Sequence, residues 1–166
     1  MAILKWMPEL NTGIDEIDVQ HRRIVDYINR LYELRETPDR NVLGEVINET
    51  VDYTLSHFAF EESMIEEAGY MFSGPHKRVH ELFTRRVGEF QARFEAGEDV
   101  ANELHGMLSR WLFNHIRNED HGYVDAVKSY QRLTGKGTSQ QQMKEQIVRE
   151  LEAKHKRKGF FARLFS

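Results

Sequence analysis

The residues of this chain that could do chemistry are mainly histidines and carboxylates that recur at helical spacing. In the stretch HFAFEE, His57 and Glu61 lie four residues apart, so on a helix they share one face. His76 and His80 have the same spacing, which lets two imidazoles face one point. The chain has no cysteine, which excludes disulfides, thiolate metal sites and cysteine nucleophiles. Any metal must therefore be held by nitrogen and oxygen.

The number of inward-facing histidines and carboxylates distinguishes a metal site from an ordinary core. A single histidine on an apolar helix face, or one isolated pair, is more often a satisfied core residue than a metal ligand. Here the predicted interior faces carry five histidines and two carboxylates: His21, His57, His76, His80, His115, Glu61 and Asp120. Without partners, so many polar groups would strongly destabilise one small core. A metal site would satisfy them together.

The number of ligands predicts two metal ions. Two ions that take about six ligands each offer about twelve positions. Five imidazoles, two bridging carboxylates and a bridging oxide or hydroxide fill about eleven of them. The remaining position could take a small diatomic molecule. Such ligands suit iron, and also manganese or zinc; because imidazoles carry no negative charge, they should favour reversible binding over oxygen activation.

The carboxylate after His115 has two candidates. Glu119 is four residues further along and is the obvious partner on a helix. Asp120, five residues along, continues the apolar row of Leu112 and Ile116 and is expected to face the interior. Glu119 has charged and polar neighbours, which suit a solvated face. We therefore predict that Asp120 is the ligand.

Two further histidines stay outside this set. His105 lies one residue off the inward row, and we expect it at the edge of the interior. His121 follows Asp120 and is expected at the surface.

Four amphipathic segments must position these groups. They run from about Asp18 to Glu36, from about Asn41 to Glu67, from near Ser73 to before Gly97, and from Val100 to about Leu133. Asp18 and Asp99 are expected N-caps, and Gly69 should follow the second helix. Short connections predict an all-α, up-down-up-down four-helix bundle over residues 1–134, with an N-terminal arm. Residues 135–166 are expected to form a flexible linker and a basic helical tail.

Composition narrows the function classes. The 166-residue chain has 30% charged residues and a formal net charge of -4, which argues against a dominant nucleic-acid interaction and favours a cytoplasmic protein. The sequence contains no run of about 18 apolar residues, so we expect no membrane span. The N-terminal MAILKWMPEL has too short an apolar core for a secretory signal.

The end of the chain has a different character. Residues 154–166, KHKRKGFFARLFS, hold five Lys or Arg, no acid and several aromatic residues. Such a segment can bind an anionic membrane surface or a groove on a protein partner. The alternative is a solvated tail whose few apolar residues cover the bundle.

Together, the motifs resemble those of the hemerythrin family from Trp6 to Tyr123. IDVQH resembles the family's first ligand element, and HFAFEE its His-Phe-x-x-Glu-Glu element. The pair His76 and His80 matches the paired-histidine element, and WLFNHIRNED resembles the last element, with its five-residue step from histidine to aspartate. One departure is Met71, where family members often have proline; it affects a loop and no ligand.

The resemblance implies a non-haem di-iron centre, with two iron ions (Fe2+/Fe3+) and a bridging oxide or hydroxide, that binds O2 reversibly and is not an enzyme. By it, His76, His80 and His115 hold one iron, His21 and His57 hold the other, and Glu61 and Asp120 bridge them. The open position falls on the iron with two histidines. The matching O2-pocket residues are Phe58, Trp111, Leu112 and Ile116, whose apolar surroundings would exclude water and slow irreversible oxidation.

The physiological use stays open between oxygen storage, delivery to an oxygen-consuming partner and sensing. A second hypothesis is a di-iron enzyme that reduces peroxide or nitric oxide. A third is a signalling module that acts through the C-terminal tail.

Overall fold

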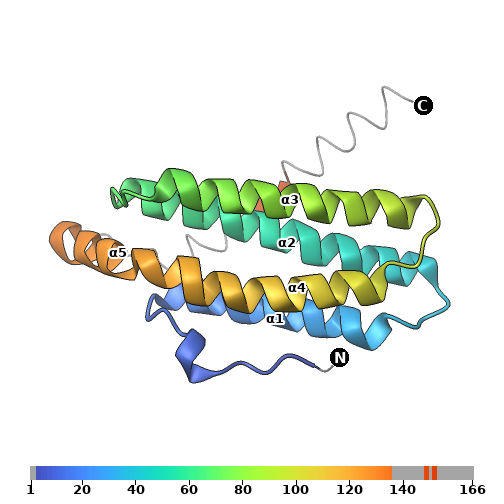
Figure 1. Ribbon diagram of the computed structural model, residues 1–166. Coiled ribbons are helices and arrows are strands. Elements are labelled where there is room, and N and C mark those ends of the chain that lie inside the picture. Colours follow the sequence, from blue (N-terminus) through green and yellow to red (C-terminus); the bar gives the residue numbers. More distant parts are fainter. Residues whose placement is uncertain (1–2, 136–147, 150, 153–166) are drawn as a thin grey trace.

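A computed structural model describes residues 3–135, 148–149 and 151–152 of the chain. The described elements are η1 (Pro8–Leu10), α1 (Asp15–Leu34), α2 (Arg40–Glu67), α3 (Ser73–Glu95), α4 (Ala101–His115), η2 (Ile116–Asp120) and α5 (His121–Thr134). Helices α1 to α4 lie side by side, and each runs opposite to the one before it (Figure 1). The predicted four-helix bundle is confirmed. Within the described residues, no helix has the length and apolar character needed to cross a bilayer.

The ends of α2 follow from local side-chain chemistry. Asp39 is its N-cap, and the carboxylate accepts hydrogen bonds from the backbone N–H groups of Asn41 and Val42. These bonds satisfy donors that have no partner inside the helix. Past the other end, Gly69 adopts φ +70°, a left-handed conformation that glycine reaches without a Cβ clash. The expected terminal glycine is confirmed.

The expected cap role of Asp18 is wrong. Helix α1 begins earlier, at Asp15, with Ile14 as N-cap, because the preceding arm folds back onto the helix. The buried Asp18 carboxylate accepts hydrogen bonds from the N–H and hydroxyl of Thr12, each at 2.8 Å, and from the N–H of Gly13 at 3.0 Å. Asp18 therefore ties the arm to α1.

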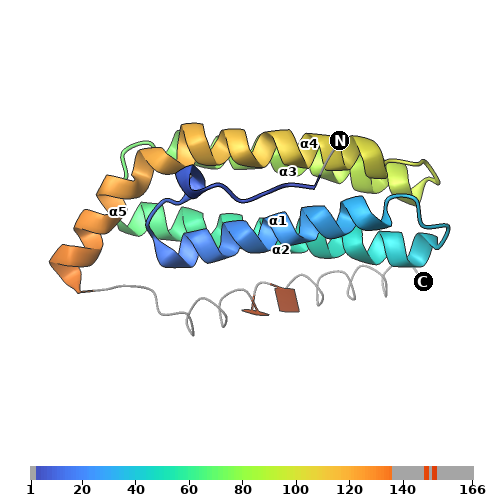
Figure 2. The ribbon, with the colours of Figure 1, turned by 90° about the horizontal axis from the view of Figure 1, so that it is seen from below.

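The expectation for the fourth segment also needs correction. Val100, not Asp99, is the N-cap of α4, and no side-chain hydrogen bond caps that end. Instead of one helix from Val100 to Leu133, the chain forms α4, a five-residue π-helical stretch η2, and α5. A π turn holds one extra residue, so the helix bends there, and α5 leaves the direction of α4 (Figure 2).

The N-terminal arm runs along the bundle between α1 and α4 (Figure 2). The backbone N–H of Leu4 donates to Oδ1 of Asn29 on α1, and Nδ2 of Asn29 donates to the carbonyl of Leu4. Further along, Arg117 on η2 forms an ion pair with Glu9 at 2.8 Å. The arm is thus fastened to α1 and to η2.

Apolar side chains form two buried clusters, and the polar residues of interest fall between them along the chain. On α1, Ile17 belongs to the smaller cluster, His21 follows, and Ile24 belongs to the larger cluster. On α2, Phe58 is in the larger cluster and Ile65 in the smaller one, on either side of Glu61. The histidines and acids therefore form a layer inside the bundle, and not a surface patch.

The predicted linker and basic tail lie outside the described residues, apart from Gly135 and residues 148–149 and 151–152. Leu151 packs against the smaller apolar cluster. The expected membrane or partner contact of residues 154–166 stays a prediction.

Candidate metal centre

The structure brings the seven predicted ligand side chains together in the interior. Each is at most 4% exposed. They form two groups, in each of which the candidate ligand atoms lie within 4.8 Å of one another: His76, His80, His115 and Glu61 in one, and His21, His57 and Asp120 in the other. We call these the three-histidine group and the two-histidine group. The residues come from four neighbouring segments, so only the folded bundle assembles them.

Both carboxylates touch both groups. Oδ1 of Asp120 lies 3.0 Å from Nε2 of His115, and its Oδ2 lies 3.0 Å from Nε2 of His21. Oε2 of Glu61 lies 3.2 Å from Nε2 of His57, and its Oε1 lies 3.3 Å from Nε2 of His76. Each acid therefore has the position required of a bridge between two cations.

All five imidazoles present Nε2 to the shared carboxylates. The Nε2 atoms of His80 and His115 lie only 2.9 Å apart. The Nδ1 atoms of the same two rings face the carboxylates of Glu62, at 3.0 Å, and Glu119, at 3.2 Å. A neutral imidazole that donates from Nδ1 to an acid, as His80 can to Glu62, keeps a lone pair on Nε2 for a metal ion. A cation placed between the two Nε2 atoms could bind to both rings.

The outer partners of the rings are the residues that the sequence analysis missed. Nδ1 of His57 lies 2.6 Å from Oε1 of Gln20, which is fully buried. Glu119 is part-exposed, as expected of a non-ligand, yet its carboxylate lies 3.2 Å from Nδ1 of His115 and is not simply solvated. Glu62 adjoins Glu61 in HFAFEE, so its position was a usable signal. Nothing in the sequence around Gln20 indicated its role.

The interior contains many buried polar atoms that lack a hydrogen-bond partner within the described residues. They include Nε2 of His21, His57 and His76, both carboxylate oxygens of Glu61, and both of Asp120. Native interiors seldom leave such atoms unsatisfied, because each one costs the lost hydration of the group. Bound metal ions at the centre of the layer would satisfy this whole set, so the residues fit a metal centre.

The protonation preferences of the two acids and of His57 also suit a cation. Burial opposes ionisation of Glu61, but His57 and His76 outweigh it and hold its pKa well below the ordinary value. Burial and Glu61 raise the pKa of Asp120, but His115 outweighs them and the net shift is downward. Burial lowers the pKa of the His57 imidazole. Ionised carboxylates next to a neutral imidazole are the form in which these side chains bind metal.

Aromatic rings lie against the imidazoles. Phe58 stacks on His80 with ring centroids 3.8 Å apart, and it also lies 6.0 Å from His57. Trp111 stacks on His115 at 4.4 Å. Leu112 and Ile116, with Phe58, belong to the larger apolar cluster, and Trp111 packs against it. The four predicted pocket residues thus belong to or pack against one apolar cluster, and Phe58 contacts both histidine groups.

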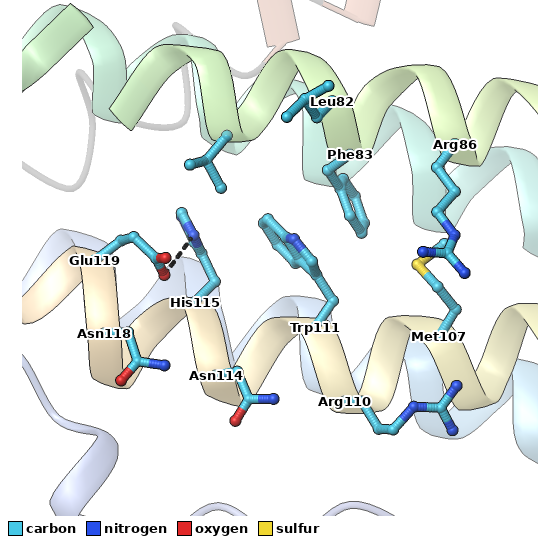
Figure 3. Close-up of a pocket in the computed structure, with 11 residues that line it drawn as sticks. Leu82, Phe83, Arg86, Met107, Arg110, Trp111, Asn114, His115, Asn118 and Glu119 are labelled. Atoms are coloured by element: carbon cyan, nitrogen blue, oxygen red, sulfur yellow. Dashed lines mark ion pairs between the residues drawn. The ribbon is translucent and has the colours of Figure 1, made fainter. Parts of the chain in front are cut away.

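A surface groove approaches the three-histidine group between α3 and α4. Its volume is about 510 Å³, and Trp111, His115 and Glu119 line the part nearest the interior. Figure 3 shows Glu119 and His115 paired at one end of the groove, with the Trp111 and Phe83 rings next along it. Glu119 therefore connects a buried ligand candidate with the solvent.

The two remaining histidines differ in environment. His121 is exposed, as expected. His105 is only 2% exposed, so the expectation that it lies at the edge of the interior is wrong. The centroid of its ring lies 4.9 Å from the centroid of the Tyr32 ring.

Comparison with known proteins gives concordant matches. The family model described as the hemerythrin HHE cation binding domain matches residues 12–127. A bacteriohemerythrin of Pseudomonas aeruginosa (strain LESB58) is 62% identical over 128 residues, which is 77% of this chain and 84% of the relative. A bacteriohemerythrin of Stenotrophomonas maltophilia (strain R551-3) is 58% identical over 130 residues, 78% of this chain and 85% of the relative.

Among solved structures, the crystal structure of wild-type hemerythrin matches with a TM-score of 0.73 and 29% identity. The match covers 76% of this chain and 98% of that chain.

Proposed function

Because the chain belongs to the hemerythrin family, we propose that it binds O2 reversibly at a non-haem di-iron centre. The observation that carries the proposal is the buried layer of five imidazoles and two carboxylates, in which each acid touches both histidine groups. Such a layer is destabilising without cations and well suited to two of them.

The residues divide the work between two positions. In the proposed centre, His76, His80 and His115 hold one ion, and His21 and His57 hold the other, with Glu61 and Asp120 shared. The second position has fewer protein ligands, which leaves room there for O2. When bound, the iron pair would supply the electrons that O2 accepts on binding.

The apolar side chains around the layer exclude water from it. Phe58 and Leu112 are at most 4% exposed, and Ile116 is fully buried. None of these side chains can donate a proton, so they exclude both water and a ready proton source from the layer. The buried Tyr123 is the exception, because burial, with the nearby Glu61 and Asp120, raises its pKa and keeps the phenol protonated. An imidazole-rich set in an apolar wall supports binding in preference to catalysis.

The test is a cycle of oxygen addition and removal on the iron-loaded full chain. Visible spectra of the reduced protein are recorded without oxygen, after O2 addition and again after its removal. We expect a new absorption band that disappears when O2 is withdrawn, over repeated cycles. Continuous consumption of O2, peroxide or nitric oxide in the presence of a reductant would instead support an enzyme. An unchanged spectrum on O2 addition would contradict the proposal.

A further inference from the structure

The polar partners on the outer side of the imidazoles differ between the two histidine groups. In the three-histidine group, two of the rings have a carboxylate behind them: Nδ1 of His80 hydrogen-bonds to Glu62 at 3.0 Å, and Nδ1 of His115 makes an ion-pair contact with Glu119 at 3.2 Å but no hydrogen bond. Both acids lie away from the shared layer and are part-exposed. They therefore act on the rings and cannot be the metal ligands of the layer.

Among the described residues, the two-histidine group has no such charge on its outer side. Nδ1 of His57 faces the amide oxygen of Gln20 at 2.6 Å, and Gln20 is fully buried. Nδ1 of His21 is buried and has no hydrogen-bond partner in the same part of the chain. In this group, the Nδ1 partner of His57 is therefore a neutral amide, and Nδ1 of His21 has no partner among the described residues.

This difference changes how strongly each ring donates electrons. A carboxylate that accepts the Nδ1 proton fixes the ring orientation and makes Nε2 a more basic ligand, whereas an amide does so less. Lys77 lies 3.9 Å from the second oxygen of Glu62, but an exposed pair at that distance offsets little of the charge. The three-histidine position therefore has one more imidazole, one ring hydrogen-bonded to a carboxylate, and a second ring with a carboxylate charge close behind it.

We infer that Glu62 and Glu119 make the three-histidine position the stronger metal site, and that Gln20 keeps the two-histidine position weaker. These are positioning residues that act through His80, His115 and His57. The first ion to bind occupies the three-histidine position. The inference rests on the proposed two-metal centre, but not on oxygen binding.

The test uses the full chain, freed of metal and titrated with Co2+ by calorimetry and visible absorption. The wild type should bind two ions in separate steps. His80→Ala should weaken the first step and His57→Ala the second, which assigns the steps to positions. The double variant Glu62→Gln and Glu119→Gln keeps both acceptors but removes both charges, and its first-step affinity should fall about tenfold or more. The exposed Glu66 of α2 gives a matched control, and Glu66→Gln should change neither step.

The opposite change tests the same idea in the other direction. Gln20→Glu places a carboxylate behind His57, so the second-step affinity should rise, and the two steps should converge. A merely structural role would lower affinity in every variant, so a rise in one of them separates the alternatives. Two equal steps in the wild type, or an unchanged first step in the double variant, would overturn the inference alone. No Co2+ binding at all would overturn the proposed function as well.

Discussion

Oδ1 of Asp120 lies 3.0 Å from Nε2 of His115, although the two residues are five positions apart on what would otherwise be one helix. On a regular α-helix, five residues correspond to a rotation of about 140° beyond a full turn. The π-helical turn η2 holds one extra residue, which turns Asp120 back toward the face of His115. A local change of helix geometry thus completes the candidate centre.

The extra residue can be removed. Asn118 is exposed in the middle of η2, and its deletion should give one regular helix in which the aspartate follows His115 by four residues and stays on its face. We therefore expect the far-ultraviolet circular dichroism to stay helical and the iron content at saturation to stay at two ions per chain. Deletion of Gly137, which follows α5 in the sequence, provides the control for a shortened chain. Loss of iron on deletion of Asn118, but not of Gly137, would show that η2 does more than bring Asp120 to the face of His115.

Asp120 and its neighbours give a second prediction. Asp120→Ala removes the carboxylate that contacts His21 and His115 together, so the iron content at saturation should fall to one ion per chain or fewer. Glu119→Ala should still hold two ions when iron is in excess, because Glu119 faces the outer nitrogen of His115 and not the shared layer. Asp125→Ala, which removes an exposed carboxylate of α5, serves as the control. Loss of iron in Glu119→Ala but not in Asp120→Ala would reverse our ligand assignment.

Metal removal should destabilise the fold, because the buried layer then keeps its unsatisfied atoms. At a free metal concentration of about 100 times Kd, binding stabilises the folded state by about 2.7 kcal/mol. For a chain of this size, the corresponding rise in Tm is about 5 to 10 °C. Thermal unfolding of the same sample before and after chelation measures it. Identical melting curves would mean that these side chains do not hold metal in the folded state.

His105 lies outside the metal layer, and its imidazole makes the free energy of unfolding depend on pH. Burial lowers the pKa of its imidazole, and the nearby Arg35 guanidinium lowers it further, while the Tyr32 ring covers it. The unfolded chain, with a pKa of about 6.5 at this residue, therefore binds its proton first as the pH falls. Stability from neutral His105 is present above that pH and is lost below it.

His105→Gln removes this titration. The free energy of unfolding, measured in urea from pH 7.5 to 5, should fall less steeply with decreasing pH in this variant than in the wild type. His121→Gln, which removes an exposed imidazole, is the matched control. Equal slopes in all three proteins would show that His105 titrates alike in the folded and unfolded chain.

The parts of the molecule that repeat at helical spacing could be predicted from the sequence. The bundle and the facing of His76 and His80 follow from the steps of three and four residues. The cap role of Asp18 could not be predicted, because it depends on how the preceding arm folds back. The π-helical stretch η2 could not be predicted for a related reason. Periodicity shows that Asp120 faces inward, but not that the backbone takes a π-helical turn to put it there. The pairing of Gln20 with His57 joins two helices, and a local pattern contains no trace of it.

The central claim is that two metal ions stabilise the buried layer of imidazoles and acids. Elemental analysis of the folded full chain, prepared with excess iron and then freed of unbound metal, tests it most directly. We predict two iron ions per chain. A content of one ion, or of none, in correctly folded protein would contradict the account.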